Sequence, residues 1–274
     1  MLLAGKLVVV TGGGSGIGAA LAVRAAVEGA GTVVVSDVNL AAAKRVAEIV
    51  AGQGCRTKAV RVDVADRADI DSLIRCAEKD FGPVDVFCSN AGIAVGAGLE
   101  ARPRQWAGTW SVNVMAHVHV AQALLPAMVD RGSGALLITA SAAGLLGLPG
   151  DAPYSVTKAA AVALAEWLAL SYGGRGVQIS ALCPLGVNTD MLRNGFDSGH
   201  PSARAVVASA PVLEPEQVAR CAFQGLAANR FLITPHLEVD AAFAEKAADI
   251  DEWLSGRRAS LFSAASRTSG GISV

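Results

Sequence analysis

A tyrosine and a lysine, Tyr154 and Lys158, stand four residues apart at the start of a stretch with helical character. At this spacing both side chains lie on one helix face, about 6 Å apart along the axis, so their polar ends can converge on one bound molecule. An ammonium beside a phenol favours the phenolate and lowers the tyrosine pKa from its ordinary value of about 10. Tyr154 is therefore a candidate proton donor and acceptor. An exposed helix face carries the same spacing without any chemistry, so the rest of the chain must decide between the two.

A glycine-rich turn, residues 11–18, has the composition of a phosphate-binding loop. It reads Thr-Gly-Gly-Gly-Ser-Gly-Ile-Gly and lies between an apolar stretch, 7–10, and a helical stretch, 17–28. Glycines let the backbone turn sharply and approach a pyrophosphate, whose charge is met by N–H groups at the helix N-terminus. A tight strand-to-helix turn without a ligand is the alternative interpretation. We expect the cofactor contacts of this turn at Gly12, Ser15, Gly16, Ile17 and Gly18.

An acidic residue, Asp37, ends the next apolar stretch, 19 residues after Gly18. At about this spacing a carboxylate receives the adenosine ribose hydroxyls of NAD and repels the 2′-phosphate of NADP. The neighbours Ser15, Val38 and Asn39 offer no arginine or lysine for that phosphate. These residues predict NAD, preferred over NADP, as the cofactor. The alternative role for Asp37 is to cap the following helix.

These residues have to be positioned by a regular alternation of strands and helices. Short apolar runs with little alternation, typical of strands buried on both faces of a parallel sheet, lie at 7–10, 32–36, 57–62, 84–89, 135–139, 177–182 and 231–234. Helical stretches fall between them at 17–28, 40–51, 68–81, 104–131, 154–172 and 216–228. The pattern predicts an α/β fold with a doubly wound parallel sheet of Rossmann type.

The domain organisation follows from the same pattern. We expect one catalytic domain over residues 1–254, in which the Gly-, Ser- and Pro-rich segment 188–214 is a substrate loop. Apolar residues at helical spacing predict a C-terminal amphipathic helix near 238–254. The composition of residues 255–274 predicts a mobile tail.

Composition and charge exclude several classes of partner. Lys plus Arg number 23 and Asp plus Glu 24, a net charge of -1 without a long basic run, so nucleic acid and acidic membranes are poor partners. Hydrophobic residues make up 52% and the mean hydropathy is +0.43, but no uninterrupted apolar run approaches the ~18 residues of a membrane span. The five cysteines are widely spaced and unpaired in sequence, and no histidine has a partner at metal spacing. We expect a cytoplasmic protein without a metal.

Because it carries the Tyr154 and Lys158 pair together with the glycine-rich turn and Asp37, the chain resembles the short-chain dehydrogenase/reductase family, in its one-domain branch, over about residues 1–235. The family's T-G-x-x-x-G-x-G motif is matched by Thr11, Gly12, Gly16 and Gly18, and its Y-x-x-x-K motif by Tyr154 and Lys158. Three further motif positions of the family, the N-A-G triplet, the helix asparagine and the serine 13 residues before the tyrosine, correspond to residues 90–92, Asn113 and Ser141.

The resemblance implies roles for more positions. Asp63 and Val64 correspond to the adenine contacts. The positions that line the cofactor cleft correspond to Asn90, Ala91 and Gly92, with Val112 beneath it. The family's P-G-x-V-x-T stretch, which holds the nicotinamide amide, is matched by Pro184, Gly186, Val187 and Thr189, with Leu185 inserted after the proline.

The implied activity is hydride transfer between the nicotinamide of NAD and a secondary alcohol or ketone. In it Tyr154 is the acid/base, Lys158 lowers its pKa and holds the nicotinamide ribose, and Ser141 polarises the substrate oxygen. Asn113 holds a water that links Lys158 to solvent. The alternatives, from the residues alone, are a helix or turn cap for Ser141 and a hydrogen-bonded core amide for Asn113.

The substrate is expected to be hydrophobic, since segments 93–99, 142–153 and 188–211 flank the site. Their apolar residues include Leu145, Leu146, Leu148, Met191 and Leu192. The alternatives are a non-catalytic NAD-binding sensor or scaffold of the same fold, and an epimerase or dehydratase of the extended branch. The intact set of four catalytic positions disfavours the first, and the chain length disfavours the second.

The helix predicted at 154–172 is apolar nearly all round, which predicts burial against a second copy. As in the family, a homodimer or homotetramer would form through this helix and the one at 104–131. The segment 235–238 replaces the Gly-Gly strand extension of many tetrameric relatives, so the usual tetramer contact is not expected here.

Overall fold

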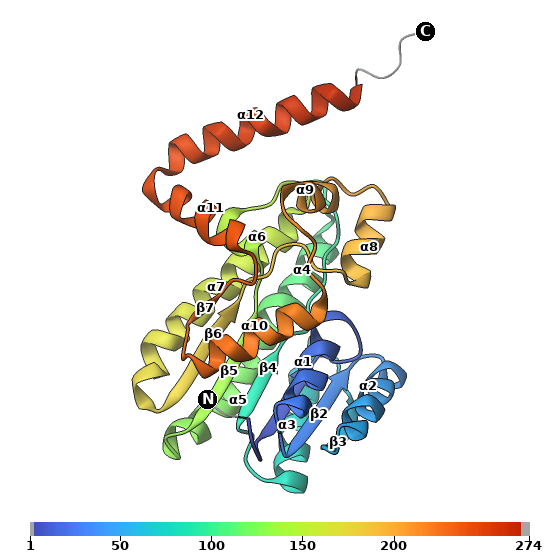
Figure 1. Ribbon diagram of the computed structural model, residues 1–274, viewed down its shortest axis with the longest axis vertical. Coiled ribbons are helices and arrows are strands. Elements are labelled where there is room, and N and C mark those ends of the chain that lie inside the picture. The colour runs from blue at the N-terminus through green and yellow to red at the C-terminus, as the bar shows by residue number, and fades with distance from the viewer. Residues whose placement is uncertain (1–2, 270–274) are drawn as a thin grey trace. The chain divides into compact units, whose positions relative to one another are not determined.

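The structure is a computed structural model that describes residues 3–269. The chain forms two compact units, Met1–Pro235 and His236–Val274. All seven strands belong to the first unit: β1 (Leu7–Thr11), β2 (Thr32–Asp37), β3 (Arg56–Arg61), β4 (Val86–Ser89), β5 (Gly134–Thr139), β6 (Val177–Leu182) and β7 (Leu232–Ile233). They form one parallel sheet in the order β3-β2-β1-β4-β5-β6-β7 (Figure 1). The predicted doubly wound parallel sheet is confirmed.

The central strands lie inside the sheet because their sequences are unbroken runs of β-branched residues. Val8, Val9 and Val10 are fully buried in β1, as is the run Val33, Val34 and Val35 beside it in β2. Both faces of these strands are covered by helices, so apolar residues are required at every position rather than at every second one. The edge strand β3 is the exception, with charged residues at both ends that face solvent. Exposed charges protect such an edge from pairing with another chain.

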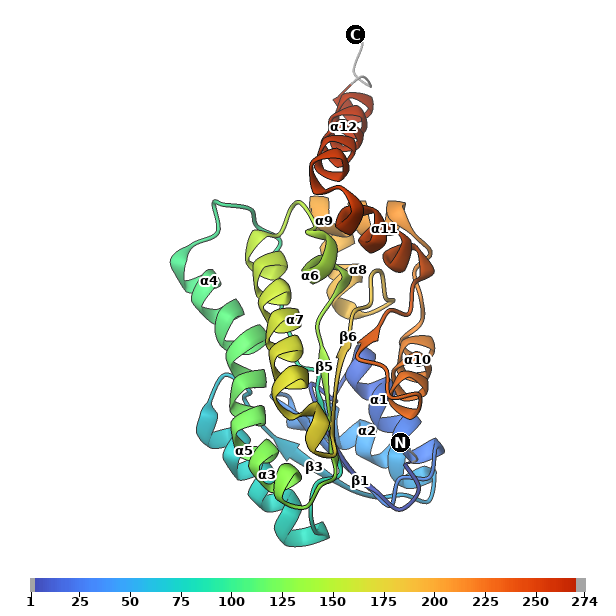
Figure 2. The ribbon, with the colours of Figure 1, turned by 90° about the vertical axis from the view of Figure 1, so that its left-hand side faces the viewer.

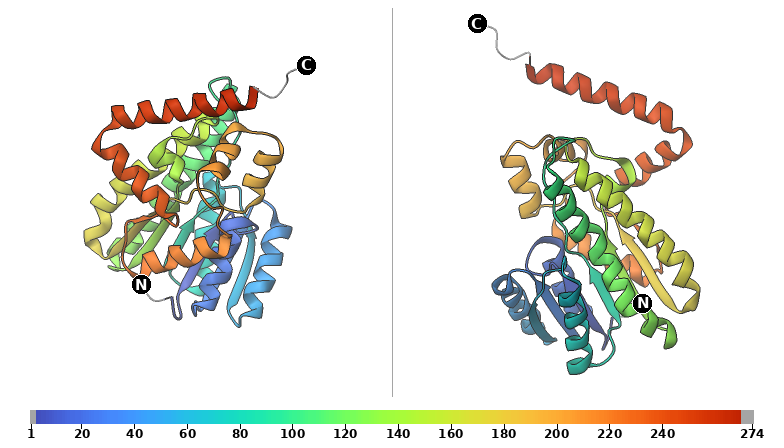
Figure 3. Two further views of the ribbon diagram at one scale, coloured as in Figure 1. Left: turned by 45° about the horizontal axis from the view of Figure 1, so that its top comes forward. Right: turned by 180° about the vertical axis from the view of Figure 1, so that it is seen from behind.

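Helices cover the sheet in two layers (Figure 2). One layer holds α1 (Gly16–Val27), α2 (Leu40–Gly52) and α10 (Pro215–Ala227). The other holds α3 (Arg67–Phe81), α4 (Pro103–Trp110), α5 (Ala116–Asp130) and α7 (Ala152–Tyr172), with α5 and α7 side by side (Figure 3). The short elements are α6 (Ala142–Leu146), η2 (Gly173–Arg175), α8 (Asp190–Asp197) and α9 (Pro201–Ser209).

The sheet order creates a crevice next to β1. From β1 the chain proceeds outward through β2 and β3 on one side, and then returns to place β4 on the other side. Neighbouring connections therefore leave the carboxyl ends of β1 and β4 in opposite directions. In open α/β sheets this switch point is where ligands bind.

The long helix predicted at 104–131 is interrupted by a π-helical turn, η1 (Ser111–Met115), between α4 and α5. Among the described residues the helical stretch Pro103–Asp130 is the one long and apolar enough to cross a membrane by length and composition. Half of its apolar window is buried inside the protein, and the core helix of a soluble protein passes the same test.

The substrate segment expected at 188–214 is more regular than a loop, because α8 and α9 occupy most of it. We call residues 188–214 the lid. Ser198 and Gly199 separate the two helices, whereas Gly195, Ser202 and Ser209 lie within them. Composition alone therefore concealed two short helices.

The second unit consists of α11 (Leu237–Ala248) and α12 (Ile250–Ser269). The amphipathic helix expected over 238–254 is thus divided at Asp249, whose backbone is extended and whose carboxylate accepts hydrogen bonds from the N–H groups of Asp251 and Glu252. The extended backbone of Asp249 ends α11, and its carboxylate caps the N-terminus of α12. The expected tail is helical as far as Ser269, and residues 270–274 lie outside the described part of the chain. Its mobility, and a single domain over 1–254, stay predictions.

Candidate active site

A cavity of about 650 Å³ lies at the carboxyl ends of the strands. Its walls come from the glycine turn, the ends of β2 to β6, the start of α7 and the lid. The predicted cofactor residues on these walls are Gly12, Ser15, Gly16, Ile17, Gly18, Asp37, Asp63, Val64, Asn90, Ala91, Gly92, Val112, Tyr154, Lys158, Pro184, Val187 and Thr189. Gly186 is not on the walls, whereas the inserted Leu185 is. Residues predicted from four separate motifs therefore meet in one place.

The glycine turn leaves no room for side chains. An added Cβ would lie 2.9 Å from Ala91 Cα at Gly12, 2.9 Å from Thr189 Cγ2 at Gly16 and 2.0 Å from the carbonyl oxygen of Gly12 at Gly18. Gly12 and Gly16 also have positive φ angles of 61° and 49°. The α1 N-terminus has neither a side-chain cap nor an acidic residue in its first turn, so its N–H groups are available to an anion. These features fit a dinucleotide pyrophosphate.

Asp37 accepts hydrogen bonds through both oxygens, from Gly14 N at 3.0 Å and Asn39 N at 2.9 Å. It does not cap α2, because Asn39 occupies the cap position and accepts from Ala42 N. The carboxylate lines the cavity beside Val38, and Lys158 is the only lysine or arginine among the lining residues. That lysine lies beside Tyr154 and Thr139, so the residues next to Asp37 offer no cation for a 2′-phosphate.

The Tyr154 and Lys158 side chains are both in the cavity wall at the start of α7. Lys158 is 2% exposed, donates from Nζ to the carbonyl oxygen of Thr139 at 2.7 Å, and has its Nζ 5.7 Å from the Tyr154 ring centroid. Burial lowers the pKa of Lys158 to about 8. The pKa of Tyr154 is raised above 10, first by burial, while a hydrogen bond with Ser141 lowers it. In contrast to the expectation from the pair alone, the pKa is raised, and the charge of Lys158 is not among the causes of this shift.

Ser141 stands where β5 passes into α6. Its Oγ accepts from Ala143 N at 3.1 Å as the cap of α6 and donates to the carbonyl oxygen of Pro184 at 3.4 Å. It is thus a helix cap, the ordinary role considered for it, and also a lining residue that bonds Tyr154. The cap holds the hydroxyl at a fixed point beside the tyrosine.

Asn113 does not line the cavity but lies behind it, fully buried in η1. Its Nδ2 donates to the carbonyl oxygen of Ile93 at 2.9 Å and to Thr157 Oγ1 at 3.1 Å, and its Oδ1 accepts from Ile93 N at 2.9 Å. Both amide hydrogens are used, so the side chain fastens the segment after β4 to α7. A Cβ added to Gly92 would lie 3.2 Å from Lys158 Nζ and 3.4 Å from Asn113 Oδ1, which places the two groups side by side. The water relay through Asn113 stays a prediction.

One helical turn after Asn113, His117 is fully buried and its Nδ1 lies 2.6 Å from Ser89 Oγ. Burial, and then the charge of Lys158, lower its pKa to about 3. It is a neutral core imidazole. Among the described residues no three histidine, cysteine, aspartate or glutamate side chains come together as a metal site would require.

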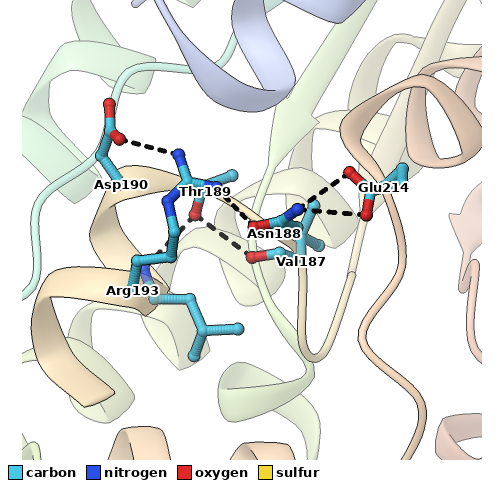
Figure 4. A network of polar contacts seen from close by, with 7 residues as sticks. Val187, Asn188, Thr189, Asp190, Arg193 and Glu214 are labelled. Carbon is cyan, nitrogen blue, oxygen red and sulfur yellow. Dashed lines mark hydrogen bonds and ion pairs between the residues drawn. The ribbon is translucent and has the colours of Figure 1, made fainter. Parts of the chain in front are cut away.

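The lid is anchored at its base by a polar network (Figure 4). Asn188 Nδ2 donates to both oxygens of Glu214 at 3.1 Å, and Arg193 bonds Asn188 and also Asp190, the latter at 2.8 Å. Asn188 N donates to the carbonyl oxygen of Leu213 at 2.8 Å. The two ends of the lid are therefore tied together, and Thr189, next to Asn188, is held against Gly16 of the glycine turn.

The substrate end of the cavity is mostly apolar. Leu148, Met191 and Leu192 line it as expected, but Leu145 and Leu146 do not, because both point into the core from α6. Four further residues line the cavity that no sequence motif identifies: Asp151, His200, Ala203 and Val206. Only Asp151 had a signal, since an aspartate three residues before Tyr154 with a proline two residues after it is typical of a helix start.

Comparisons with known proteins identify the relatives of this chain. The model of the short chain dehydrogenase family matches residues 6–198. The 2-(S)-hydroxypropyl-CoM dehydrogenase 3 of Xanthobacter autotrophicus is 37% identical over 66% of this chain and 71% of its own, and the 1-deoxy-11-beta-hydroxypentalenate dehydrogenase of Streptomyces exfoliatus is 36% identical over 85% and 84%. A crystal structure of a short chain dehydrogenase/reductase from Burkholderia phymatum in complex with NAD superposes with a TM-score of 0.83 at 30% identity, covering 92% of this chain and 96% of that one.

Proposed function

This chain belongs to the short-chain dehydrogenase family and is an oxidoreductase of CH–OH groups with a nicotinamide cofactor, and we propose that it prefers NAD and acts on a hydrophobic secondary alcohol or ketone. The observation that carries the proposal is the meeting of Ser141, Tyr154 and Lys158 at one end of a cavity whose other end has the glycine turn and Asp37. A protein that only bound the dinucleotide would not need Ser141, Tyr154 and Lys158 together.

In this proposal the chain's own residues manage the proton. When bound, the nicotinamide supplies or accepts the hydride. Tyr154 exchanges a proton with the substrate oxygen. Ser141, fixed by its cap, turns its single O–H from the carbonyl oxygen of Pro184 to the substrate oxygen and donates a hydrogen bond to it. Lys158, held by Thr139, binds the cofactor ribose and stabilises the phenolate as it forms. Asn113 keeps Ile93, next to the cavity residue Gly92, in place.

The preference for NAD rests on Asp37. A ribose diol donates hydrogen bonds to a carboxylate, whereas a 2′-phosphate beside the same carboxylate is repelled. Each oxygen of Asp37 already accepts one backbone N–H, which fixes the carboxylate but leaves a lone pair for a hydroxyl.

The hydrophobic substrate is inferred from the walls beyond Tyr154. Ile93, Leu148, Met191 and Val206 line the cavity from three segments, and Lys158 is the one lysine or arginine among the lining residues. The Streptomyces relative is named for a hydroxylated substrate, 1-deoxy-11-beta-hydroxypentalenate. Cyclic secondary alcohols and their ketones are therefore the first compounds to test.

For assembly we propose a homodimer or homotetramer. Trp167 and Leu170 of α7 are 59% and 88% exposed, and Val156 and Trp110 add apolar surface on α7 and on the neighbouring α4. Such a patch is covered at low cost by the same patch of a second copy. All five cysteines are free, which fits the proposed location in the cytoplasm.

The test is a screen of NADH absorbance over hydrophobic alcohols and ketones, with Tyr154→Phe as the companion variant. We expect turnover with NAD on at least one cyclic alcohol, and a loss of about 100-fold or more in Tyr154→Phe with unchanged NADH binding. A Tyr154→Phe protein that turns over like the parent would remove Tyr154 from this role. NADH binding without turnover on any compound would instead favour the non-catalytic sensor.

A further inference from the structure

We propose that Asp151 is a positioning residue: it holds the substrate segment after β4, residues 93–98, against the start of α7, and so sets the place and the protonation of Tyr154. The inference rests on the proposed acid/base role of Tyr154. It concerns a side chain that lines the cavity and is only 3% exposed.

The Asp151 carboxylate accepts three backbone hydrogen bonds from two segments. Its Oδ1 accepts from Tyr154 N at 3.0 Å, which caps α7. Its Oδ2 accepts from Val95 N at 2.9 Å and from Gly96 N at 2.6 Å. A helix cap needs only the first of these bonds. The other two tie the substrate segment to the residue that begins the catalytic helix.

Other bonds hold the same segment on both sides of this point. Ala152 N, next to Asp151, donates to the carbonyl oxygen of Ala97 at 2.9 Å. Asn113 holds Ile93 through both its N–H and its carbonyl group, and reaches α7 through Thr157. Asp151 is the only charged side chain in this set, and bonds to a charged acceptor are about twice as strong as neutral ones. It is therefore the group whose loss should free residues 95–97.

The lid rests on the residues that Asp151 fixes. Gly96 has a φ of +63°, and a Cβ added there would lie 2.2 Å from His200 Nδ1. On the other side of Asp151, a Cβ added to Gly150 would lie 2.7 Å from Ser202 N. The start of α9 therefore packs on both segments that meet at Asp151. Displacement of Gly96 would displace the lid wall of the substrate site as well.

Asp151 also acts on the phenol through its charge. Asp151, at the cap of α7, and Cys183, after β6, act on Tyr154 through their charge. The wall of the same cavity also carries Lys158 of α7 and Asp190 and His200 of the lid. Burial is the largest cause of the raised pKa of Tyr154, and the carboxylate of Asp151 raises it further. An anion next to a phenol opposes the phenolate, so removal of this charge should favour ionisation of Tyr154.

Two substitutions distinguish the cap of α7 from the hydrogen bonds that Asp151 accepts from Val95 and Gly96. Asp151→Ser keeps an oxygen that caps α7 but is too short to reach Val95 and Gly96, while Asp151→Asn keeps the shape and loses the charge. The matched control is Asp66→Ser, at the cap of α3, where Asp66 accepts only from the nearby Ala68 N. Far-ultraviolet circular dichroism and NADH fluorescence establish that each variant folds. Asp151→Asn carries the test should Asp151→Ser not fold.

The first readout is the ionisation of Tyr154, which needs no substrate. The chain has 2 tyrosines, so a Tyr172→Phe background leaves Tyr154 as the sole source of the tyrosinate absorbance. We expect a midpoint at lower pH in both Asp151 variants than in this background, and no shift in Asp66→Ser. Coincident midpoints in all four proteins would overturn the proposal.

The second readout is kinetic and uses the compound found by the screen. We expect KM for that compound to rise about tenfold or more in both Asp151 variants, with KM for NAD within about twofold of the parent. An unchanged KM for the compound would overturn the positioning role. A parent without turnover on any compound refutes the proposed function alone, because the titration still decides the role of Asp151.

Discussion

The replacement Lys158→Met is expected to make the protein more stable while it abolishes turnover. Lys158 carries its charge in a buried site, and burial lowers its pKa from 10.5 to about 8. That difference corresponds to a cost of about 3 kcal/mol for the charged form at neutral pH. Methionine has a similar length and no charge, so the substitution removes the cost.

Part of this gain is lost again, because the carbonyl oxygen of Thr139 loses the donor that reaches it at 2.7 Å. A buried carbonyl without a partner costs about 1–2 kcal/mol. The expected net gain is about 1–2 kcal/mol at about pH 7, or a melting temperature higher by roughly 2–8 °C. The control is Lys44→Met, because Lys44 is exposed on α2 and its change should stay within about 0.5 kcal/mol.

The pH dependence provides the sharper test. Between the lowered pKa of about 8 in the folded state and 10.5 in the unfolded state, the unfolded parent binds more protons at Lys158. The parent therefore gains stability as the pH rises through this window, and its deficit relative to Lys158→Met shrinks. Thermal or urea unfolding of both proteins at several pH values measures the gap. A variant less stable than the parent at neutral pH, or a gap that does not change with pH, would refute the reasoning.

Three further predictions concern the cofactor, the proton and the assembly. Asp37→Ala should raise KM for NAD about tenfold and lower the preference over NADP; a parent that prefers NADP would contradict the role of Asp37. Because the pKa of Tyr154 is raised, alcohol oxidation should speed up as the pH rises above neutral and ketone reduction should slow down. Pre-steady-state rates across this range check the sign, and a faster oxidation at acid pH would count against it. Trp167→Glu with Leu170→Glu should lower the assembled mass in light scattering, and an unchanged mass would place the interface elsewhere.

The sheet could be predicted from the sequence because each strand is a run of consecutive apolar residues that fits a buried strand. A run such as Val8, Val9 and Val10 fits a strand covered on both faces, and the structure buries all three completely. The start of α7 was predicted within two residues, and its true start at Ala152 follows from the cap at Asp151. Predictions of this kind depend on neighbours in sequence.

The pKa of Tyr154 and the hydrogen bonds of Asp151 depend on tertiary contacts. The sign of the Tyr154 pKa shift could not be inferred from the lysine four residues away, because burial by the surrounding wall is the largest cause of the shift and raises the pKa. Asp151 stood inside a segment expected to flank the substrate, but its bonds reach Val95 and Gly96, more than fifty residues away. No local pattern reports such a partner.

The π-helical turn Ser111–Met115 has a consequence for the helix as a whole. Each residue turns an α-helix by about 100°, so the one extra residue of a π turn puts α5 out of phase with α4 by about that angle. Trp110 before the turn is half exposed, while Val120 and Leu124 after it belong to the core. One continuous helix thereby presents two different faces, and Asn113 sits at the change of phase. Deletion of a single residue there would leave every functional side chain in the sequence and still rotate one half of the helix away from Ile93.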